Sequence, residues 1–264
     1  MESVVAAHPY LGADVPLALA HRGGAKYAPN AGIENTIAAF RNALDLGYRY
    51  LETDVYVSSD GVVYAFHDHD LARLTGHAGG IETLTSEEID QVLVAGSEPI
   101  PRLADVLQAF PEARFNIDFK SAKAVKPTVQ VVADHHAQGR VCFASFEYAR
   151  LRRARLMASW AATSASPVEI ALVKVSPVRW IRSIARKHGV VAFQVPHRRH
   201  GITIVTPTFI RRAHELGIQV HVWTIDDREE MSHLLDLGVD GIVTDRIDIL
   251  KELLVSRGQW KDAA

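Results

Sequence analysis

Residues 44–54, LDLGYRYLETD, carry the pattern that bears most directly on the fold, because residues 235–245, LDLGVDGIVTD, repeat it near the other end of the chain. Each stretch reads as the end of a helix, a glycine that stops the helix, and a strand that finishes in Thr-Asp. Similar β/α units that recur around a barrel produce such a repeat. Chance similarity between two α/β turns is the alternative interpretation.

Short apolar runs alternate along the chain with segments of helical periodicity, which indicates β/α units and a parallel sheet. A (β/α)8 barrel requires eight such strands. They are expected at Leu17–His21, Tyr50–Val55, Phe115–Lys120, Val141–Ser145, Ala161–Ser164, Val191–Val195, Gln219–Thr224 and Gly241–Thr244. A doubly wound open sheet is the alternative fold, but no glycine-rich dinucleotide-binding loop follows the first strand.

Two helices between these strands can be read in some detail. Ile37, Phe40 and Leu44 recur at the three- and four-residue spacing of one buried helix face. The segment TPTFIRRAHELG predicts a second helix, with Thr206 as its cap, a proline in its first turn and Gly217 as its stop.

Residues 56–110 interrupt the alternation of strands and helices. The tetrapeptide SSDG at 58–61 predicts a turn. A strand-like run, VVYAFH, follows it, and a further helix is expected near Ser86–Val94. We interpret this stretch as an insertion after the second strand. The prediction is therefore an α/β protein, a single (β/α)8 TIM barrel domain over residues 1–264 with an insertion at about 56–110.

Composition limits the classes of function. The 264 residues include 29 Lys and Arg and 31 Asp and Glu, giving a net charge of −2. This balance lacks the basic excess of a nucleic-acid-binding protein, although a locally positive site for an anion is compatible with it. The single cysteine, Cys142, excludes an intrachain disulfide and a cysteine-based zinc site. It is compatible with a reducing compartment.

The amino terminus and the lengths of the apolar runs bear on the cellular compartment of the protein. No signal peptide is recognisable at the amino terminus, and no apolar stretch approaches the ~20 residues of a membrane span. We therefore expect a cytoplasmic protein without a membrane span. The sequence carries no prediction of its oligomeric state.

Three acids mark a candidate site. Residues two apart in a strand point the same way, so Glu52 and Asp54 share one face of their strand, and Asp118 shares a face with Asn116 and Lys120 in the next. In a parallel barrel the three carboxylates are then expected to converge near the carboxyl ends of the strands. Because uncompensated buried charge is costly, a cation is their natural partner. Oxygen ligands favour Mg²⁺ or Ca²⁺ over zinc. Structural ion pairs with Arg22 and Lys120 are the alternative.

Two histidines are expected near these acids. His21 ends the first strand, at the barrel end where active sites form. If SSDG turns a hairpin, the returning chain brings His67 to roughly the level of Glu52. The alternative is an exposed loop histidine in the polar run HDHD, because a hairpin register slips easily by one or two residues.

Other polar residues follow the strands. Arg22 and Lys120 suit an anionic group, the first as a fork and the second as a point charge. Trp223 is expected either to wall the pocket or to pack in the core. The run HRRH at 197–200 is either on the same rim or simply solvated. Helix capping is a sufficient role for Asp226, Asp227 and Asp245.

Seven short motifs keep a specific order and spacing over most of the chain, although each alone is weak. They are HRGG at 21–24, ENT at 34–36, ETD at 52–54, FHD at 66–68, NIDFK at 116–120, VWTID at 222–226 and GVDGIVTDR at 238–246. Together they resemble the glycerophosphodiester phosphodiesterase family. The resemblance implies a (β/α)8 barrel with a small insertion after the second strand, in agreement with the irregular stretch.

The resemblance also implies an activity, the hydrolysis of a glycerophosphodiester, a small molecule, to sn-glycerol 3-phosphate and an alcohol with a divalent cation, Mg²⁺ or Ca²⁺. By motif position it implies an acid–base pair of His21 and His67, metal ligands Glu52, Asp54 and Asp118, phosphate contacts Arg22 and Lys120, and a site acid Glu34. Trp223 is added as a substrate contact. The family usually has Glu where this chain has Asp118, whose shorter side chain reaches a metal less directly or through water.

Three other functions stay open at this point. One is a lysophospholipase-D-like lyase of the same fold that stops at a cyclic phosphate. Another is a metal-dependent barrel aldolase acting on a keto acid, and the third is a non-catalytic phosphodiester-binding protein. The pair of histidines argues against the last two. The alcohol head group is not readable from the sequence.

Overall fold

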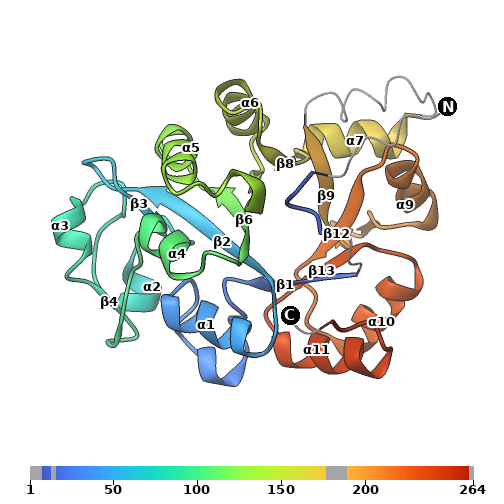
Figure 1. Ribbon diagram of the computed structural model, residues 1–264, viewed down its shortest axis with the longest axis horizontal. Helices are drawn as coiled ribbons and strands as arrows, with labels where there is room; N and C mark the ends of the chain where they lie inside the picture. The colour runs from blue at the N-terminus through green and yellow to red at the C-terminus, as the bar shows by residue number, and fades with distance from the viewer. Residues whose placement is uncertain (1–7, 13–15, 177–188, 262–264) are drawn as a thin grey trace.

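The computed structural model describes residues 8–12, 16–176 and 189–261. Its centre is a closed barrel of parallel strands surrounded by helices (Figure 1). Neighbouring barrel strands are β1 (Leu17–His21), β2 (Tyr50–Val57), β6 (Arg114–Phe119), β7 (Val141–Ala144), β8 (Ala162–Ser164), β9 (Val190–Pro196), β12 (Gln219–Trp223) and β13 (Gly241–Thr244). Because β1 pairs with both β2 and β13, these eight parallel strands close into a barrel. The predicted barrel and its eight strands are confirmed, with bounds that differ by two residues at most.

Helices follow the strands and form the outer layer (Figure 1). They are α1 (Ile37–Asp45), α4 (Leu103–Ala109), α5 (Val125–Asp134), α6 (Tyr148–Met157), α7 (Pro167–Val175), α9 (Pro207–His214), α10 (Arg228–Asp236) and α11 (Ile247–Ser256), with short 3-10 turns η1 (Ala28–Asn30) and η2 (Gln138–Arg140). Thr206 caps α9 as expected, because its hydroxyl accepts the N–H of Phe209.

The two copies of the LDLG pattern adopt the same backbone turn. Gly47 after α1 and Gly238 after α10 have φ of 90° and 88°, a left-handed conformation that glycine adopts without strain. Each glycine donates its N–H to the carbonyl three residues earlier. The chain then enters β2 or β13, and the sequence repeat is therefore structural.

The stretch between β2 and α4 holds short elements at one side of the barrel (Figure 1). They are β3 (Val63–Ala65), α2 (Ala72–Thr75), α3 (Ser86–Ile89), β4 (Leu93–Val94) and β5 (Glu98–Pro99). Strand β3 returns antiparallel on β2 after the SSDG turn. The helix expected to reach residue 94 ends at Ile89 instead, because the chain then enters the β4–β5 pair and buries Val92 and Val94 in a separate apolar cluster.

The strand 115–120 alternates as the sequence indicates. Phe115, Ile117 and Phe119 are fully buried and pack with residues of α4 and α5 in the largest apolar cluster. Asn116 and Asp118 occupy the opposite face and are also buried. The outer layer therefore fixes the strand, and its polar residues are left to the barrel interior.

Residues 8–12 cover the amino ends of the barrel strands. Tyr10 is fully buried against Leu17, Leu19 and Tyr50. The Tyr50 hydroxyl donates to the Tyr10 carbonyl at 3.1 Å and accepts the N–H of Gly12 at 2.8 Å. An apolar layer therefore separates this end of the barrel from the polar side chains nearer the other end.

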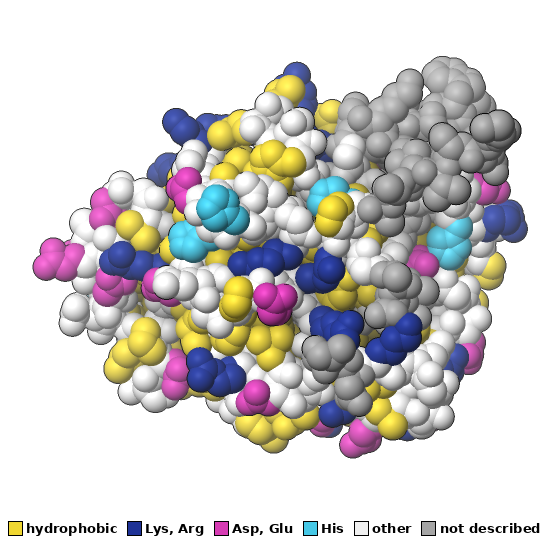
Figure 2. All heavy atoms as spheres, in the orientation of Figure 1, with side chains coloured by type: hydrophobic (Ala, Val, Ile, Leu, Met, Phe, Trp, Pro, Cys, Tyr) yellow, Lys and Arg dark blue, Asp and Glu magenta, His cyan; other side chains and the backbone are white. Residues whose placement is uncertain are grey.

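Charged side chains are unevenly spread over the surface. In the orientation of Figure 1, Lys and Arg side chains gather near the middle of the visible face beside hydrophobic ones (Figure 2). A small cavity of about 100 Å³ is lined by Arg49, Arg114 and Lys261 among others. The near-neutral net charge therefore conceals local regions of one sign.

The helices of residues 8–12, 16–176 and 189–261 bear on membrane crossing. None of their helices is long and apolar enough to span a bilayer. The expectation about a signal peptide concerns the amino terminus, where residues 1–7 and 13–15 lie outside the described residues.

Candidate active site

A cavity of about 400 Å³ opens at the carboxyl ends of the barrel strands. Eight of the nine residues proposed from the sequence line it: His21, Arg22, Glu52, Asp54, His67, Asp118, Lys120 and Trp223. The ninth, Glu34, lies behind Arg22 and accepts a hydrogen bond from its guanidinium at 3.0 Å. Residues from six separate motifs therefore meet in one place.

The HRGG turn places Arg22 at the centre of the site. Arg22 itself has φ of 53°, and Gly23 and Gly24 follow with φ of 84° and 92°. A Cβ atom on Gly23 would lie 2.9 Å from Ala39, so the turn packs directly on α1. The turn aims the Arg22 N–H at Glu52, at 3.2 Å, and brings its Nε to 3.2 Å from Asp54.

Lys120 bridges two of the predicted metal ligands. Its Nζ lies 2.7 Å from an oxygen of Asp54 and 2.7 Å from an oxygen of Asp118. Burial raises the pKa of Asp54, but Lys120 and Arg22 outweigh it and hold that pKa below its usual value. The pKa of Asp118 is raised, because burial outweighs the pull of Lys120.

Glu52 is a buried carboxylate with a second carboxylate as its neighbour. Burial, and then the neighbouring Asp54, raise the pKa of Glu52 to about 7. Its Oε2 lies 3.8 Å from Nε2 of His21. Burial lowers the pKa of His21, but Glu52 and Asp245 outweigh it and raise that pKa above its ordinary value. The carboxylates of Glu52 and Asp245 therefore favour the protonated form of His21.

Asp245 holds the other side of the His21 ring, with 2.7 Å between Nδ1 and Oδ1. Lys26 lies 3.6 Å from Asp245 and 2.7 Å from Asp226. The expectation that these two aspartates cap helices is therefore wrong, because both side chains turn back to the mouth of the barrel. Asp227 does cap α10, accepting the N–H of Glu230 at 2.8 Å.

His67 has a matching aspartate. Its Nδ1 lies 2.6 Å from Asp68, and Asp68 accepts Nε of Arg73 at 2.5 Å. The β2–β3 pairing continues so that Phe66 donates to the carbonyl of Asp54 at 2.9 Å, which sets His67 opposite residue 53. This is one residue from the expected level of Glu52.

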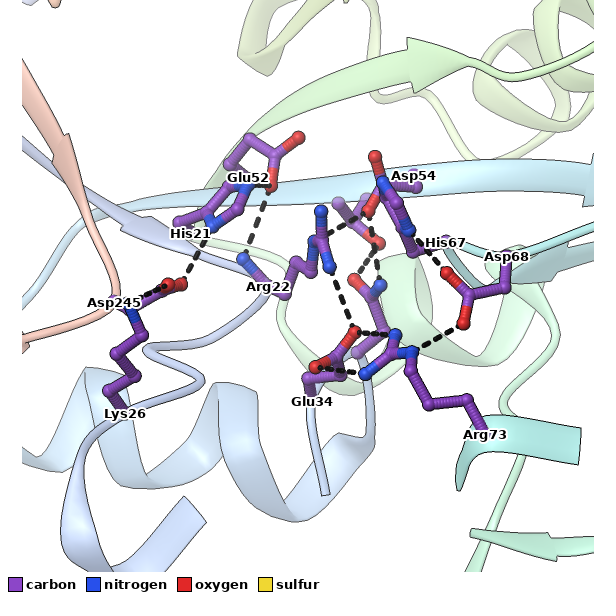
Figure 3. Close-up of polar contacts among 12 residues, drawn as sticks. His21, Arg22, Lys26, Glu34, Glu52, Asp54, His67, Asp68, Arg73 and Asp245 are labelled. Atoms are coloured by element: carbon purple, nitrogen blue, oxygen red, sulfur yellow. Dashed lines mark hydrogen bonds and ion pairs between the residues drawn. The ribbon is translucent and has the colours of Figure 1, made fainter. Parts of the chain in front are cut away.

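Arg73 joins this group to the rest of the site. Besides Asp68, it contacts both oxygens of Glu34, at 2.6 and 3.2 Å, and Glu34 in turn holds Arg22. In Figure 3 the two histidines lie on either side of Arg22, with Asp245 and Asp68 beyond them. A continuous chain of ion pairs therefore runs from the insertion to the centre of the barrel.

The remaining wall of the cavity is mostly apolar. Trp223 lines it and meets Phe146 edge to face, with ring centroids 5.5 Å apart. The HRRH run divides: Arg199 lines the cavity, whereas His197 is buried and pairs with Glu230 at 2.6 Å. His221 is enclosed within the barrel, where burial lowers its pKa to about 4.

The buried carboxylates bear on whether the site can hold a divalent cation. Within residues 8–12, 16–176 and 189–261, no three His, Cys, Asp or Glu side chains stand close enough to share a metal, and Lys120 holds Asp54 and Asp118 together instead. The donor chemistry nevertheless fits a hard cation. Oδ1 of Asp118 is buried without a hydrogen-bond partner, and Glu52 is buried beside a second carboxylate, that of Asp54.

Sequence reasoning missed three residues that contact predicted ones: Asp68, Arg73 and, in its actual role, Asp245. It also missed Lys26, which contacts Asp245 and Asp226. Asp68 follows His67 in the FHD motif at 66–68, so the motif that marked the histidine could also have marked the aspartate. Asp245 follows the last strand, and only closure of the barrel brings it to His21. No local pattern marks Arg73 or Lys26, whose partners come from distant segments.

The sequence of this chain is similar to those of known phosphodiesterases. The model of the glycerophosphoryl diester phosphodiesterase family matches residues 21–249. A protein of Mycobacterium tuberculosis named probable glycerophosphodiester phosphodiesterase 2 is 38% identical over 250 residues, covering 94% of each chain. A lysophospholipase D of Rattus norvegicus is 25% identical, covering 89% of this chain and 85% of that protein.

Solved structures share the barrel. A glycerophosphodiester phosphodiesterase of Agrobacterium tumefaciens has a TM-score of 0.72 at 25% identity, and the match covers 90% of this chain and 100% of that one. A phosphodiesterase of Oleispira antarctica, solved with its product sn-glycerol-3-phosphate, has a TM-score of 0.76 at 22% identity, covering 91% and 97%. Since the family model spans most of the chain, this protein belongs to the glycerophosphoryl diester phosphodiesterase family.

Proposed function

We propose that the protein hydrolyses a glycerophosphodiester to sn-glycerol 3-phosphate and an alcohol, with His21 and His67 as the general acid and base. One observation carries the proposal. Two histidines, each held through Nδ1 by an aspartate, face the same cavity as three buried carboxylates and two cations. Membership of the family supports the same reaction.

The histidines suit the two proton transfers of phosphodiester cleavage. One group must take the proton of the attacking oxygen, and another must give a proton to the leaving oxygen. Histidine serves both, because its ordinary pKa lies near neutrality. In each case the aspartate at Nδ1 fixes the ring and leaves Nε2 for the substrate. Either histidine can take either role in this arrangement.

Arg22 and Lys120 bind the phosphate in this mechanism. Both are held among carboxylates of a buried site, so their charges are oriented before the substrate arrives. Positive groups fixed where charge develops stabilise the transition state without reorganisation. Glu34 keeps Arg22 in place from behind.

A divalent cation, Mg²⁺ or Ca²⁺, would be held by Glu52, Asp54 and Asp118. When bound it supplies further positive charge for the phosphate. The test is turnover of glycerophosphoglycerol, glycerophosphocholine and related diesters with Mg²⁺, Ca²⁺, Mn²⁺ or chelator. We expect activity to be lost in chelator and restored by one of the cations. Full activity after chelation would contradict the metal proposal, and no turnover of any diester would contradict the function.

The order of bond formation has two versions. In the first, the glycerol 2-hydroxyl attacks and water then opens the cyclic phosphate; in the second, water attacks directly. The second candidate is a lysophospholipase-D-like enzyme that stops at the cyclic phosphate. A protein named lysophospholipase D is among the relatives, although that name does not specify a cyclic product. Phosphorus NMR of the products separates them, since sn-glycerol 3-phosphate and a cyclic phosphate give distinct resonances.

Asp118→Glu tests the short acid of the proposed metal site. We expect the variant to keep activity within about tenfold and to bind Mg²⁺ or Ca²⁺ more tightly, because the added methylene carries the carboxylate further into the cavity; overpacking costs about 1–3 kcal/mol of stability. Calorimetric titration of chelator-stripped protein measures the affinity. An inactive Asp118→Glu, matching Asp118→Asn, would mean that the pocket requires the shorter side chain.

Asp68→Asn tests the positioning of His67. The amide cannot accept the Nδ1 proton as a charged partner, so we expect kcat to fall at least about tenfold while KM changes little. Asp68→Glu should recover part of the loss. Asp70→Asn is the matched control, because Asp70 is exposed and its carboxylate accepts the backbone N–H of Ala72, away from His67. Equal effects of Asp68→Asn and Asp70→Asn would remove Asp68 from the mechanism.

A further inference from the structure

The cavity carries cations on two opposite sides. Arg22 and Lys120 follow β1 and β6, the two parallel neighbours of β2. Lys174 of α7 and Arg199, which follows β9, line the same cavity. Three barrel strands separate β2 from β9 in either direction, so the two strands face each other across the barrel (Figure 1). The proposed mechanism uses only the first pair of cations.

A short hairpin carries Arg199. Its strands β10 (Arg198–Arg199) and β11 (Ile202–Thr203) pair antiparallel. The two residues between them, His200 and Gly201, have φ of 49° and 77°. Positive φ at both positions is the conformation of a tight two-residue hairpin turn. Because neighbouring residues of a strand point to opposite faces, this hairpin directs Arg199 to the cavity and Arg198 away from it.

Lys174 is tied to the same hairpin. Its Nζ donates to the carbonyl of Thr203 at 2.6 Å, and this contact uses one of the three N–H groups of the ammonium. Arg212 of α9 donates to the carbonyl of Val173 at 3.3 Å and to that of Lys174, so the end of α7 is held as well. The two cations therefore stand on one anchored part of the rim.

No carboxylate neutralises this second pair within residues 8–12, 16–176 and 189–261. Neither Lys174 nor Arg199 has an ion-pair partner there. The carboxylates that line the cavity are Glu52, Asp54 and Asp118, all on β2 and β6. They are engaged with Arg22 and Lys120 on the opposite side. The charge of the second pair is therefore open to a ligand.

The sequence around these residues has an unusual charge pattern. Residues 170–214 contain nine Lys and Arg and no Asp or Glu, so all 31 acids of the chain lie outside this stretch. A run of like charge is ordinarily solvated and needs no ligand. Here, however, two of its members line the cavity that also holds the proposed catalytic residues. The near-neutral net charge therefore conceals a positive wall beside the site.

The placement of the two pairs determines which part of a substrate meets the second one. With the phosphate held by Arg22 and Lys120, a substituent that crosses the cavity reaches the side of Lys174 and Arg199. The lining between the pairs includes the rings of Phe146 and Trp223, and apolar surroundings strengthen the interaction of charges. Since glycerol itself is uncharged, a charge that reaches this side belongs to the esterified alcohol.

We propose that Lys174 and Arg199 form a second anion subsite, so that the favoured substrates are glycerophosphodiesters whose alcohol carries its own negative charge. This inference rests on the proposed function, which places the scissile phosphate at Arg22 and Lys120. The second anion is a carboxylate or a phosphate, and both suit a guanidinium beside an ammonium. A quaternary ammonium head group is repelled from the same place.

Four matched series of substrates test the inference. In each, sn-glycerol 3-phosphate is esterified with a straight alcohol of two to five methylenes that ends in a carboxylate, a phosphate, a carboxamide or a trimethylammonium group. At the best length we expect kcat/KM of the carboxylate or the phosphate to exceed that of the carboxamide about 10–100-fold, the range of a charged hydrogen bond. The ammonium should fall below the carboxamide.

The carboxamide is the neutral control of this comparison, because it matches the carboxylate in size and differs in charge. The larger of the two anionic ratios identifies the favoured anion. Ratios of both anions to the carboxamide that stay near one at every length overturn the inference, and turnover of the carboxamide then leaves the proposed function intact.

Arg199→Glu tests the subsite itself, with Arg198→Glu as the matched control. Both arginines are exposed on β10, but only Arg199 lines the cavity. The two variants change the net charge equally, so a difference between them is local. We expect Arg199→Glu to lower the ratio of carboxylate to carboxamide kcat/KM at least tenfold and to raise turnover of the ammonium, and Arg198→Glu to change neither. An unchanged ratio in Arg199→Glu overturns the inference.

Binding provides a measurement that does not need turnover. Alkylphosphonates that end in a carboxylate or in the matching carboxamide resist hydrolysis and present the same pair of groups to the cavity. Calorimetry should show the carboxylate binding the wild-type protein at least tenfold more tightly than the carboxamide, and the difference should disappear in Arg199→Glu. Equal affinity of the two compounds for the wild type overturns the inference even if no diester is hydrolysed.

Discussion

His21→Ala and His67→Ala are each expected to lower kcat for glycerophosphodiester hydrolysis by about 10²–10⁴-fold, the usual contribution of a positioned acid or base. The effect is large because each ring is fixed by its own aspartate, at 2.7 Å for His21 and 2.6 Å for His67. Steady-state kinetics with the best diester of the head-group panel measures the loss. Since the two residues serve one reaction, the double variant should lose little more than the worse single variant.

The control for these variants is His77→Ala, which removes an exposed histidine of the insertion. It should retain wild-type kcat. Circular dichroism and thermal melting show whether His21→Ala and His67→Ala keep the fold. A folded variant of either histidine with near-wild-type turnover would contradict its assignment as acid or base.

Lys120→Met is expected to produce the second large effect, on both stability and turnover. The ammonium bridges two buried carboxylates at 2.7 Å each, and only 16% of the Lys120 side chain is exposed. Removing one partner of a buried ion pair typically costs about 3–5 kcal/mol, which lowers Tm by roughly 10 °C. Loss of the phosphate contact should also lower kcat/KM by about 10²–10³-fold.

Lys123→Met is the matched control, because Lys123 lies in the same loop with 72% of its side chain exposed and its partner Glu82 at 3.9 Å. Exposed pairs contribute about 0–1 kcal/mol. Added Mg²⁺ or Ca²⁺ should raise the Tm of Lys120→Met more than that of the wild type, since a bound cation compensates the same carboxylates. If Lys120→Met melts at the wild-type temperature, the bridge contributes nothing to stability.

The barrel was predictable because its signals are local. A buried strand needs only a short apolar run, and the alternation in FNIDFK already separates Phe115, Ile117 and Phe119 from the polar face. The glycine turns after α1 and α10 repeat because the same helix-to-strand connection recurs. The length of helix α3 was overestimated. The chain leaves the helix for β4 because Val92 and Val94 pack within the apolar cluster of the insertion, and helical spacing in the sequence does not reveal this packing.

The site was predictable only in part. Residues on neighbouring strands, such as Glu52 and Asp118, follow from strand periodicity and barrel order. Asp245 and His21 are 224 positions apart, and no spacing in the sequence joins them before the barrel closes.

The contacts of Arg73 limit how the insertion of this protein can be exchanged for that of a relative. The helix α2 that carries it belongs to the insertion, yet its guanidinium is shared between Asp68 and Glu34, one from each side of the boundary between insertion and barrel. The insertion is therefore not an interchangeable module. A graft that replaces it must preserve this three-residue junction, or the transplanted segment will arrive without its attachment to the catalytic end of the barrel.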